Sequence, residues 1–313
     1  MAEKFDLKLA QSMVLSTAYK AVKTVSKFIS PWSPVATMPG AFGKAISEMP
    51  GKVGDGKLWF VVGKDATTGV IAYERLEDMP HLMISGITKS GKSVFLNCLM
   101  ASLLMRNDSK SLRLGLIDKA KVELGDYAKL PHVIGGVRFT IESAYELIHE
   151  CTLEMERRIN LLLGKGVKNL ADYNSKVSDP LPRWVIVIDE FAYLLASARK
   201  NKDTKEITAL FEAEMSDLAA VARKTGIHLV LCTQKPLVVI VDTLMKSNFP
   251  SRVAFKMSCS RDSETALGRT GIAAEKLKGS GDMYFLSAEG GDPFRLQGLW
   301  VSDEDIRTVV EGG

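Results

Sequence analysis

The sequence predicts an α/β fold, in which a mostly parallel sheet carries helices on both faces. The first observation is the order of segments, because short apolar runs typical of strands alternate with longer amphipathic runs typical of helices. The second is a continuous apolar run at 184–188, which is typical of a central strand buried on both faces. The third is a glycine-rich turn at 86–91, which stands between a predicted strand and a predicted helix.

Composition indicates a folded protein with an apolar core. Of the 313 residues, 46% are hydrophobic and 25% are charged, and the length suggests one or two domains. The net charge of +4 is compatible with nucleic-acid binding but does not require it. The four cysteines are scattered, which predicts neither a disulfide framework nor a zinc site and favours a reducing cytoplasm. We expect no membrane span, because no apolar run approaches about 20 residues, and no signal peptide.

A phosphate-binding loop organises the chain. Residues 86–93 fit the pattern G-x-x-x-x-G-K-[ST] between a predicted strand at 82–84 and a predicted helix at 94–105. The glycines allow a tight turn whose N–H groups point at one anion, and the helix N-terminus adds a favourable dipole. Lys92 is expected to reach the β- and γ-phosphates of ATP, and the Ser93 hydroxyl to hold Mg²⁺. The alternative is a glycine-rich turn that binds no nucleotide. The predicted nucleotide-binding residues are Gly86, Ile87, Thr88, Lys89, Ser90, Gly91, Lys92, Ser93 and Val94.

Two carboxylates follow the apolar run at 184–188. Asp189 and Glu190 stand at the C-terminal end of this predicted strand, where ligands bind in open α/β sheets. We expect Asp189 to hold Mg²⁺, directly or through water, and Glu190 to orient and deprotonate the attacking water. The alternative is that the pair only begins a helix, since both residue types favour helix N-termini. The phosphate loop upstream favours the catalytic interpretation.

The chain is expected to fall into four parts. Residues 1–30 are predicted to form an amphipathic helix, because apolar residues recur at spacings of three and four with lysines between them. Pro31 and Pro34 end this helix, and residues 31–57 are predicted to be a linker rich in Gly and Pro. Two strands within 58–80 are predicted to form a small β cap, and residues 81–313 the main domain.

Strands and helices alternate within 81–313. Further strands are predicted at 113–117, 227–232 and 252–257, and helices at 141–163, 170–175 and 204–224. This order implies a sheet whose parallel strands are joined by helices.

A series of motifs resembles the motor domain of the FtsK/SpoIIIE family of DNA translocases, from about residue 61 to residue 301. The matching segments are Gly63-Lys64-Asp65, Met79-Pro80-His81-Leu82, the phosphate loop, Glu154-Met155-Glu156-Arg157-Arg158, Asn169-Leu170-Ala171-Asp172-Tyr173-Asn174, Asp189-Glu190-Phe191-Ala192, Gly226-Ile227-His228-Leu229, Thr233-Gln234-Lys235-Pro236, Lys246-Ser247-Asn248-Phe249-Pro250-Ser251-Arg252 and Gly279-Ser280-Gly281-Asp282-Met283. So many matches in one order make a chance resemblance improbable.

The resemblance implies a RecA-like P-loop NTPase that forms a hexameric ring around duplex DNA and moves the DNA with the energy of ATP. It assigns nucleotide and Mg²⁺ binding to Lys92 and Ser93, and a part in hydrolysis to Asp189 and Glu190.

Two further residues receive roles from the resemblance alone. Gln234 resembles the polar residue that senses the γ-phosphate. Arg223 matches the arginine finger that enters the neighbouring subunit's site, where a guanidinium stabilises charge on the transferring phosphoryl group. Without the family, a solvated charge near a helix end, where the helix dipole favours cations, is the better explanation of Arg223.

The chain departs from the family at several positions. Lys89 stands in the phosphate loop where the family usually has Gly, Tyr193 where it has Asp, and Lys235 where it has Arg. These differences leave the details of coupling open, but not the prediction of ATP hydrolysis. We expect neither a membrane-spanning N-terminal domain nor a C-terminal winged helix that reads orienting DNA sequences. The chain therefore resembles a compact motor of the mobile-element or phage type.

These observations predict an ATP-dependent translocase of double-stranded DNA that works as a homo-oligomeric ring in the cytoplasm. The alternatives are a conjugative coupling ATPase, a protein-secretion ATPase of the same superfamily, and an inactive scaffold. A single ATPase domain argues against secretion, and the intact site residues argue against a scaffold. The helix at 1–30 is interpreted as a recruitment element. Its apolar face could instead pack on the motor or between ring neighbours, or lie on a membrane surface.

Overall fold

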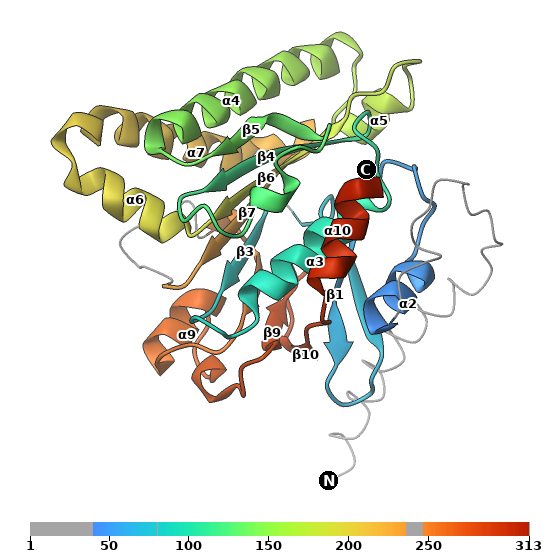
Figure 1. The fold of residues 1–313 in the computed structure, drawn as a ribbon. Helices are drawn as coiled ribbons and strands as arrows, with labels where there is room; N and C mark the ends of the chain where they lie inside the picture. The colour runs from blue at the N-terminus through green and yellow to red at the C-terminus, as the bar shows by residue number, and fades with distance from the viewer. Residues whose placement is uncertain (1–39, 80, 236–246, 313) are drawn as a thin grey trace. The chain divides into compact units, whose positions relative to one another are not determined.

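The computed structural model describes residues 40–79, 81–235 and 247–312, which form an α/β body (Figure 1). The helix predicted at 1–30 lies outside these residues.

Ten strands of the described residues form one mixed sheet. They are β1 (Trp59–Asp65), β2 (Ile71–Arg75), β3 (Leu82–Ser85), β4 (Leu112–Asp118), β5 (Val133–Arg138), β6 (Arg183–Asp189), β7 (Ile227–Thr233), β8 (Ser251–Ala254), β9 (Asp282–Leu286) and β10 (Phe294–Gln297). The order across the sheet is β2-β1-β10-β9-β8-β3-β7-β6-β4-β5. The strands from β8 to β5 in this order pair in parallel, whereas β9, β10, β1 and β2 are added by antiparallel pairing.

Helices cover both faces of this sheet. They are α2 (Gly40–Glu48), α3 (Lys92–Leu104), α4 (Ile141–Gly164), α5 (Leu170–Asn174), α6 (Phe191–Lys200), α7 (Lys205–Val221), α9 (Ser260–Leu267) and α10 (Asp303–Gly312). Residues of α2, α3 and α10 pack in one buried cluster, and residues of α4, α6 and α7 pack in a second cluster on the opposite face (Figure 1). In β6, Val185 and Val187 belong to the first cluster and Ile186 and Ile188 to the second, as the alternation of a strand requires. None of the described helices is long and apolar enough to cross a membrane.

Local sequence explains where the main elements begin and end. Strand β6 is built from β-branched residues that suit a pleated surface buried on both faces. Helix α4 begins at a capping box, in which the Thr140 side chain accepts from the N–H of Ser143 and the Ser143 side chain accepts from the N–H of Thr140. Helix α5 begins with Asn169, whose side chain accepts from the N–H of Asp172.

Two predicted boundaries differ from the structure. Strands β1 and β2, expected in a small separate cap at 58–80, extend the main sheet, because Lys64 of β1 pairs with Gln297 of β10. Part of the predicted linker at 31–57 is helix α2, whose Phe42 and Ile46 are buried in the core. The burial of these side chains outweighs the low helix propensity of its glycines, which concealed the helix in the sequence.

Parallel pairing brings the carboxyl ends of four strands to one edge of the sheet. Ser85 of β3 lies beside Thr233 of β7, and Asp118 of β4 lies beside Asp189 of β6. The residues that follow these strands therefore converge at that edge, where ligands bind in sheets of this type.

Candidate nucleotide-binding site

The loop between β3 and α3 depends on close backbone approaches at two glycines. A Cβ on Gly86 would stand 2.5 Å from Ser90 Oγ and 2.7 Å from Phe255 Cβ. Gly91 has a φ of +115°, and a Cβ there would stand 2.6 Å from the backbone nitrogen of Gly281. Both positions require glycine, because any other residue would overlap these neighbours.

The segment before β9 packs against this loop. The N–H of Gly281 donates to the carbonyl oxygen of Ser90 at 2.8 Å. The adjacent Asp282 is held by Arg295 of β10, whose Nε and Nη2 lie 3.0 and 2.7 Å from the two carboxylate oxygens. Because such a bidentate pair fixes orientation as well as distance, the backbone of the phosphate loop has a defined support.

Lys92 begins α3 and contacts both predicted catalytic carboxylates. Its Nζ lies 2.8 Å from Asp189 Oδ1 and 3.4 Å from Glu190 Oε2, and the residue is only 7% exposed. Burial acts to lower the pKa of the Lys92 ammonium, but the electrostatic effects of Cys232 and of both carboxylates raise the pKa above its ordinary value. The structure thus places a permanent cation between Asp189, the last residue of β6, and Glu190, which follows it.

Glu190 adopts a left-handed backbone conformation, with φ +53° and ψ +50°. Residues other than glycine rarely do so, and surrounding contacts must maintain the strain. The backbone N–H of Gln234 donates to Glu190 Oε1 at 3.0 Å, and the side-chain Oε1 of Gln234 accepts from Thr88 Oγ1 at 3.0 Å. Gln234 therefore links the phosphate loop to the carboxylate of Glu190.

The Ser93 hydroxyl contacts a carboxylate that the sequence analysis did not identify. Ser93 Oγ donates to Glu123 Oε1 at 2.6 Å. Glu123 lies in the segment after β4, whose carboxyl end is at the same edge of the sheet. The available signal in the sequence was the acidic residue shortly after the predicted strand at 113–117.

The residues of this edge suit nucleotide phosphates together with Mg²⁺. Among the described residues, no group of three or more His, Cys, Asp or Glu side chains could hold a metal ion by itself. A nucleotide-bound Mg²⁺ needs fewer protein ligands, because it retains waters and uses phosphate oxygens together with one or two protein groups. Ser93 and Asp189 offer such a pair of ligands. The buried Ser90 Oγ has no hydrogen-bond partner within the described residues. An unsatisfied donor inside a phosphate loop fits an anionic ligand.

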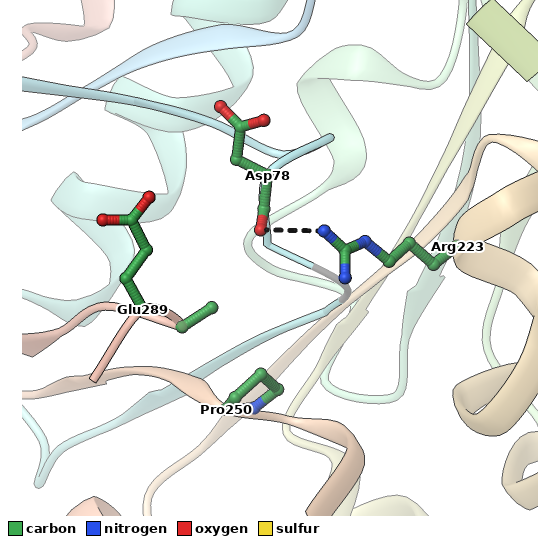
Figure 2. Close-up of a pocket in the computed structure, with 5 residues that line it drawn as sticks. Asp78, Arg223, Pro250 and Glu289 are labelled. Atoms are coloured by element: carbon green, nitrogen blue, oxygen red, sulfur yellow. Dashed lines mark hydrogen bonds between the residues drawn. The ribbon is translucent and has the colours of Figure 1, made fainter. Parts of the chain in front are cut away.

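Arg223 lies at the opposite edge of the sheet from this cluster. It belongs to the short 3₁₀ turn η4 (Ala222–Thr225), which precedes β7, whereas Gln234 follows β7. The strand separates its two ends by roughly 20 Å, at about 3.3 Å per residue. Figure 2 shows the Arg223 guanidinium directed into a pocket, where its Nη2 donates to the carbonyl oxygen of Asp78 at 3.4 Å. The residues lining the pocket are Asp78, Arg223, Pro250, Ala288 and Glu289.

Comparison with known proteins identifies a family and relatives that this chain resembles. The model of the FtsK/SpoIIIE family matches residues 44–181. The chain carries an FtsK/SpoIIIE family domain. The DNA translocase FtsK of Borreliella burgdorferi is 39% identical over 264 residues, which cover 82% of this chain and 32% of that protein. The chain spans about a third of the length of the curated relatives it matches.

Solved structures show the same fold. The pCW3 conjugation coupling protein TcpA, in its monomer form with ATPγS, superposes with a TM-score of 0.72 and 28% identity, covering 84% of this chain and 73% of that chain. ATPases 2 and 3 of EssC from Geobacillus thermodenitrificans superpose with a TM-score of 0.70 and 19% identity, covering 84% of this chain and 50% of that chain. These likenesses confirm the predicted RecA-like P-loop NTPase fold.

The departures from the FtsK/SpoIIIE pattern lie on the surface. Lys89 is exposed and has a φ of +63°, a conformation that suits the glycine usual in the family. Tyr193, in the first turn of α6, is 53% exposed, and Lys235 is exposed. The remaining predicted residues, Ile87 and Val94, are half-buried in the loop and in the first turn of α3.

Proposed function

We propose that this chain is an ATP-dependent translocase of double-stranded DNA that works as a homo-oligomeric ring, in the simplest case a hexamer. The observation that carries the proposal is the buried cluster in which Lys92 lies between Asp189 and Glu190, beside the phosphate loop. Relatives named DNA translocase FtsK, at 37–39% identity, support the assignment of DNA as the substrate that is moved.

Each residue of the cluster has a separate role in this proposal. Lys92 leaves its ion pairs to bind the β- and γ-phosphates of ATP, while Ser93 and Asp189 hold Mg²⁺. When bound, Mg²⁺ would neutralise charge on the phosphate oxygens. Glu190 orients the attacking water and accepts its proton at a carboxylate oxygen.

Gln234 is proposed to report the γ-phosphate to the rest of the site. Its side chain contacts Thr88 of the phosphate loop, and its backbone N–H holds Glu190. A phosphate that enters the loop competes for the Thr88 hydroxyl, and this changes the contact that orients the Glu190 carboxylate. Nucleotide occupancy is thereby coupled to the position of the base.

Arg223 is proposed to complete the site of a neighbouring subunit. Within one chain, β7 separates it from the phosphate loop, so it cannot reach its own nucleotide. In a ring, the exposed guanidinium would stabilise charge on the phosphoryl group of the adjacent site, an effect worth about 10³ to 10⁵ in rate. The proposed site is therefore incomplete in a monomer.

The direct test is the ATPase rate of the full chain with and without DNA. We expect duplex DNA of any sequence to stimulate hydrolysis, because contacts to phosphate oxygens position a protein without reading bases. The logarithm of DNA affinity should fall linearly with the logarithm of salt concentration, as counterion release requires. ATP hydrolysis that duplex DNA leaves unchanged at low salt would contradict the translocase proposal, and no hydrolysis under any condition would favour a scaffold.

A second candidate is a coupling ATPase of conjugation, which the similarity to TcpA favours. This function would differ in partner more than in chemistry. The same assay with single-stranded and double-stranded DNA of equal length distinguishes the candidates in part, because a duplex translocase should respond mainly to duplex. A response only to single strands would contradict a translocase of duplex DNA.

A further inference from the structure

The segment between β4 and the 3₁₀ turn η2 (Gly125–Tyr127) is folded around one buried carboxylate. Asp118, which is fully buried, accepts hydrogen bonds from four successive N–H groups at 2.9 to 3.1 Å. The donors are Lys121, Val122, Glu123 and Leu124. A carboxylate that accepts several backbone hydrogen bonds fixes the path of the chain around it. The backbone of Glu123 is therefore held directly.

Contacts on the other side of Glu123 fix the segment further. Leu124 and Tyr127 are buried, and the Tyr127 hydroxyl donates to Asn97 Oδ1 of α3 at 3.0 Å. Lys121 has a φ of +61°, a strained conformation for a residue with a Cβ. Such strain is retained where the surrounding structure requires it, and here it turns the chain so that Glu123 reaches the first turn of α3.

The contact that results has a specific chemical meaning. A serine hydroxyl has one proton to donate and two lone pairs that can accept or bind a cation. Ser93 Oγ donates its proton to Glu123 Oε1 at 2.6 Å. The lone pairs of Ser93 are thereby left available to a cation, and the direction of the hydroxyl is set by Glu123.

The charges around the site favour a cation at this place. The buried thiol of Cys232 has a raised pKa, first because of burial, and the carboxylates of Asp189, Glu190 and Glu123 raise it further while Lys92 lowers it. Asp189 and Glu190 share the single ammonium group of Lys92, and Glu123 contacts the hydroxyl of Ser93. A surplus of negative charge in partly buried surroundings is stabilised by a bound cation.

The geometry points to Glu123 as a positioning residue for the Mg²⁺ of the nucleotide site, which acts by accepting the Ser93 hydroxyl proton and aiming the oxygen at the ion. This inference rests on the proposed function, because it assumes that nucleotide and Mg²⁺ bind at the phosphate loop. Partners of metal ligands typically change metal affinity by about 10 to 100-fold when they are removed.

The test is the affinity of the full chain for a fluorescent ADP analogue, measured in EDTA and during titration with MgCl₂. The variant Glu123→Ala is expected to bind the analogue in EDTA as tightly as the wild type, but to need about 10 to 100-fold more Mg²⁺ to gain the metal-dependent increase in affinity. Glu123→Gln keeps an acceptor oxygen for Ser93 and should lie between the two. The matched control is Asp126→Asn, which removes an exposed carboxylate three residues further along.

The outcomes separate this inference from the proposed function. If Glu123→Ala requires the same Mg²⁺ concentration as the wild type, or loses affinity equally in EDTA and in MgCl₂, Glu123 has only a structural role and the inference is wrong. An equal effect of Asp126→Asn would also overturn it, because the effect would then be one of general charge. Failure of the wild type to bind the analogue at all would instead contradict the proposed function.

Discussion

Arg158 Nη1 donates a hydrogen bond to the carbonyl oxygen of Thr225 at 2.8 Å, and the Arg158 side chain is fully buried. The same guanidinium donates through Nε to Glu154 Oε1 at 2.6 Å and lies over the Trp184 ring at 5.4 Å. Thr225 belongs to the turn η4, which carries Arg223. The motif at 154–158 therefore supports the turn on which the proposed arginine finger stands.

We predict that Arg158→Ala lowers the free energy of unfolding by about 2 to 5 kcal/mol, because it leaves a cavity in place of a fully buried side chain and removes the donor to the carbonyl oxygen of Thr225. Urea denaturation measures this change. The matched control is Arg157→Ala, which removes an exposed partner of the same Glu154 and should cost about 1 kcal/mol or less. Equal losses in the two variants would show that the buried contacts of Arg158 contribute nothing beyond a surface ion pair.

Substitutions of Lys92 and Glu190 are expected to impair different steps, nucleotide binding and hydrolysis respectively. Lys92→Ala should lose nucleotide binding, because the buried cation for the phosphates is gone. Glu190→Gln should bind ATP and hydrolyse it very slowly, since an amide still accepts from the N–H of Gln234 but cannot take a proton from water. Equilibrium binding of a fluorescent nucleotide and steady-state hydrolysis distinguish the two effects. Turnover by Glu190→Gln near the wild-type rate would mean that another residue is the base.

Local sequence patterns were sufficient to predict the centre of the fold. Strands β3 and β6 contain continuous apolar runs, β7 is apolar apart from His228 and Thr233, and the phosphate loop has a fixed spacing of glycines. The antiparallel part was not predictable in the same way. Strand β10 is short and mostly exposed, and its partner β1 lies near the other end of the chain, so neither periodicity nor spacing indicates their pairing.

The candidate site also contains residues that the sequence predicts and residues whose role depends on the tertiary structure. Asp189 and Glu190 end a recognisable strand, and Lys92 belongs to a motif, so their meeting followed from the parallel order of strands. The role of Glu123 depends on the turn around Asp118 and on the register of β4 with β6, which are tertiary features. The helix predicted at 204–224 ends at 221, and Arg223 lies in a separate 3₁₀ turn that tertiary contacts support.

Arg223 is expected to act between subunits. Arg223→Ala should fold and bind ATP, because the residues that bind the nucleotide are unchanged. It should hydrolyse ATP poorly, because each site lacks the arginine that the neighbouring subunit supplies. Mixing Arg223→Ala protein with Lys92→Ala protein should restore part of the activity, since some interfaces then combine one intact Lys92 with one intact Arg223. The controls are Arg223→Ala protein alone and Lys92→Ala protein alone, each treated in the same way as the mixture. If mixed assemblies form and no activity returns, the two residues do not share a site.

Glu74 is expected to make stability depend on pH. It lies half-buried on β2, and burial, followed by the charges of Glu289 and Asp78, raises the pKa of its carboxyl group to about 7. The native state thus keeps a proton that the unfolded chain releases above its ordinary pKa near 4.5. The stabilisation is fully present below about pH 4.5 and is lost as the pH rises through 7.

The variant Glu74→Gln imitates the protonated carboxyl group at every pH. We expect it to unfold at a higher temperature than the wild type at pH 8, by an amount corresponding to at most about 3 kcal/mol, and to differ little from it at pH 5. Buried His81 makes stability change with pH in the opposite sense, because burial lowers its pKa to about 3 and stability is therefore lost as the pH falls. This effect is the same in Glu74→Gln and in the wild type, so comparing the two proteins at each pH removes it. Glu304→Gln, at an exposed position on α10, is the control. An advantage of Glu74→Gln that is the same at both pH values would contradict a raised pKa.

Lys89 combines a strained backbone with a charge at the phosphate loop, and two substitutions separate these properties. Lys89→Gly removes both, whereas Lys89→Ala removes the charge but keeps the Cβ that makes a φ of +63° unfavourable. Relief of this strain is partly offset by the larger entropy of glycine in the unfolded chain, so we expect Lys89→Gly to be more stable than Lys89→Ala by about 1 kcal/mol or less. Urea denaturation measures this difference, and equal stabilities would argue that the loop relaxes around the side chain. Nucleotide affinity reports the charge independently: if the Lys89 ammonium contacts phosphate, both variants lose affinity equally, and if it remains in solvent, neither does.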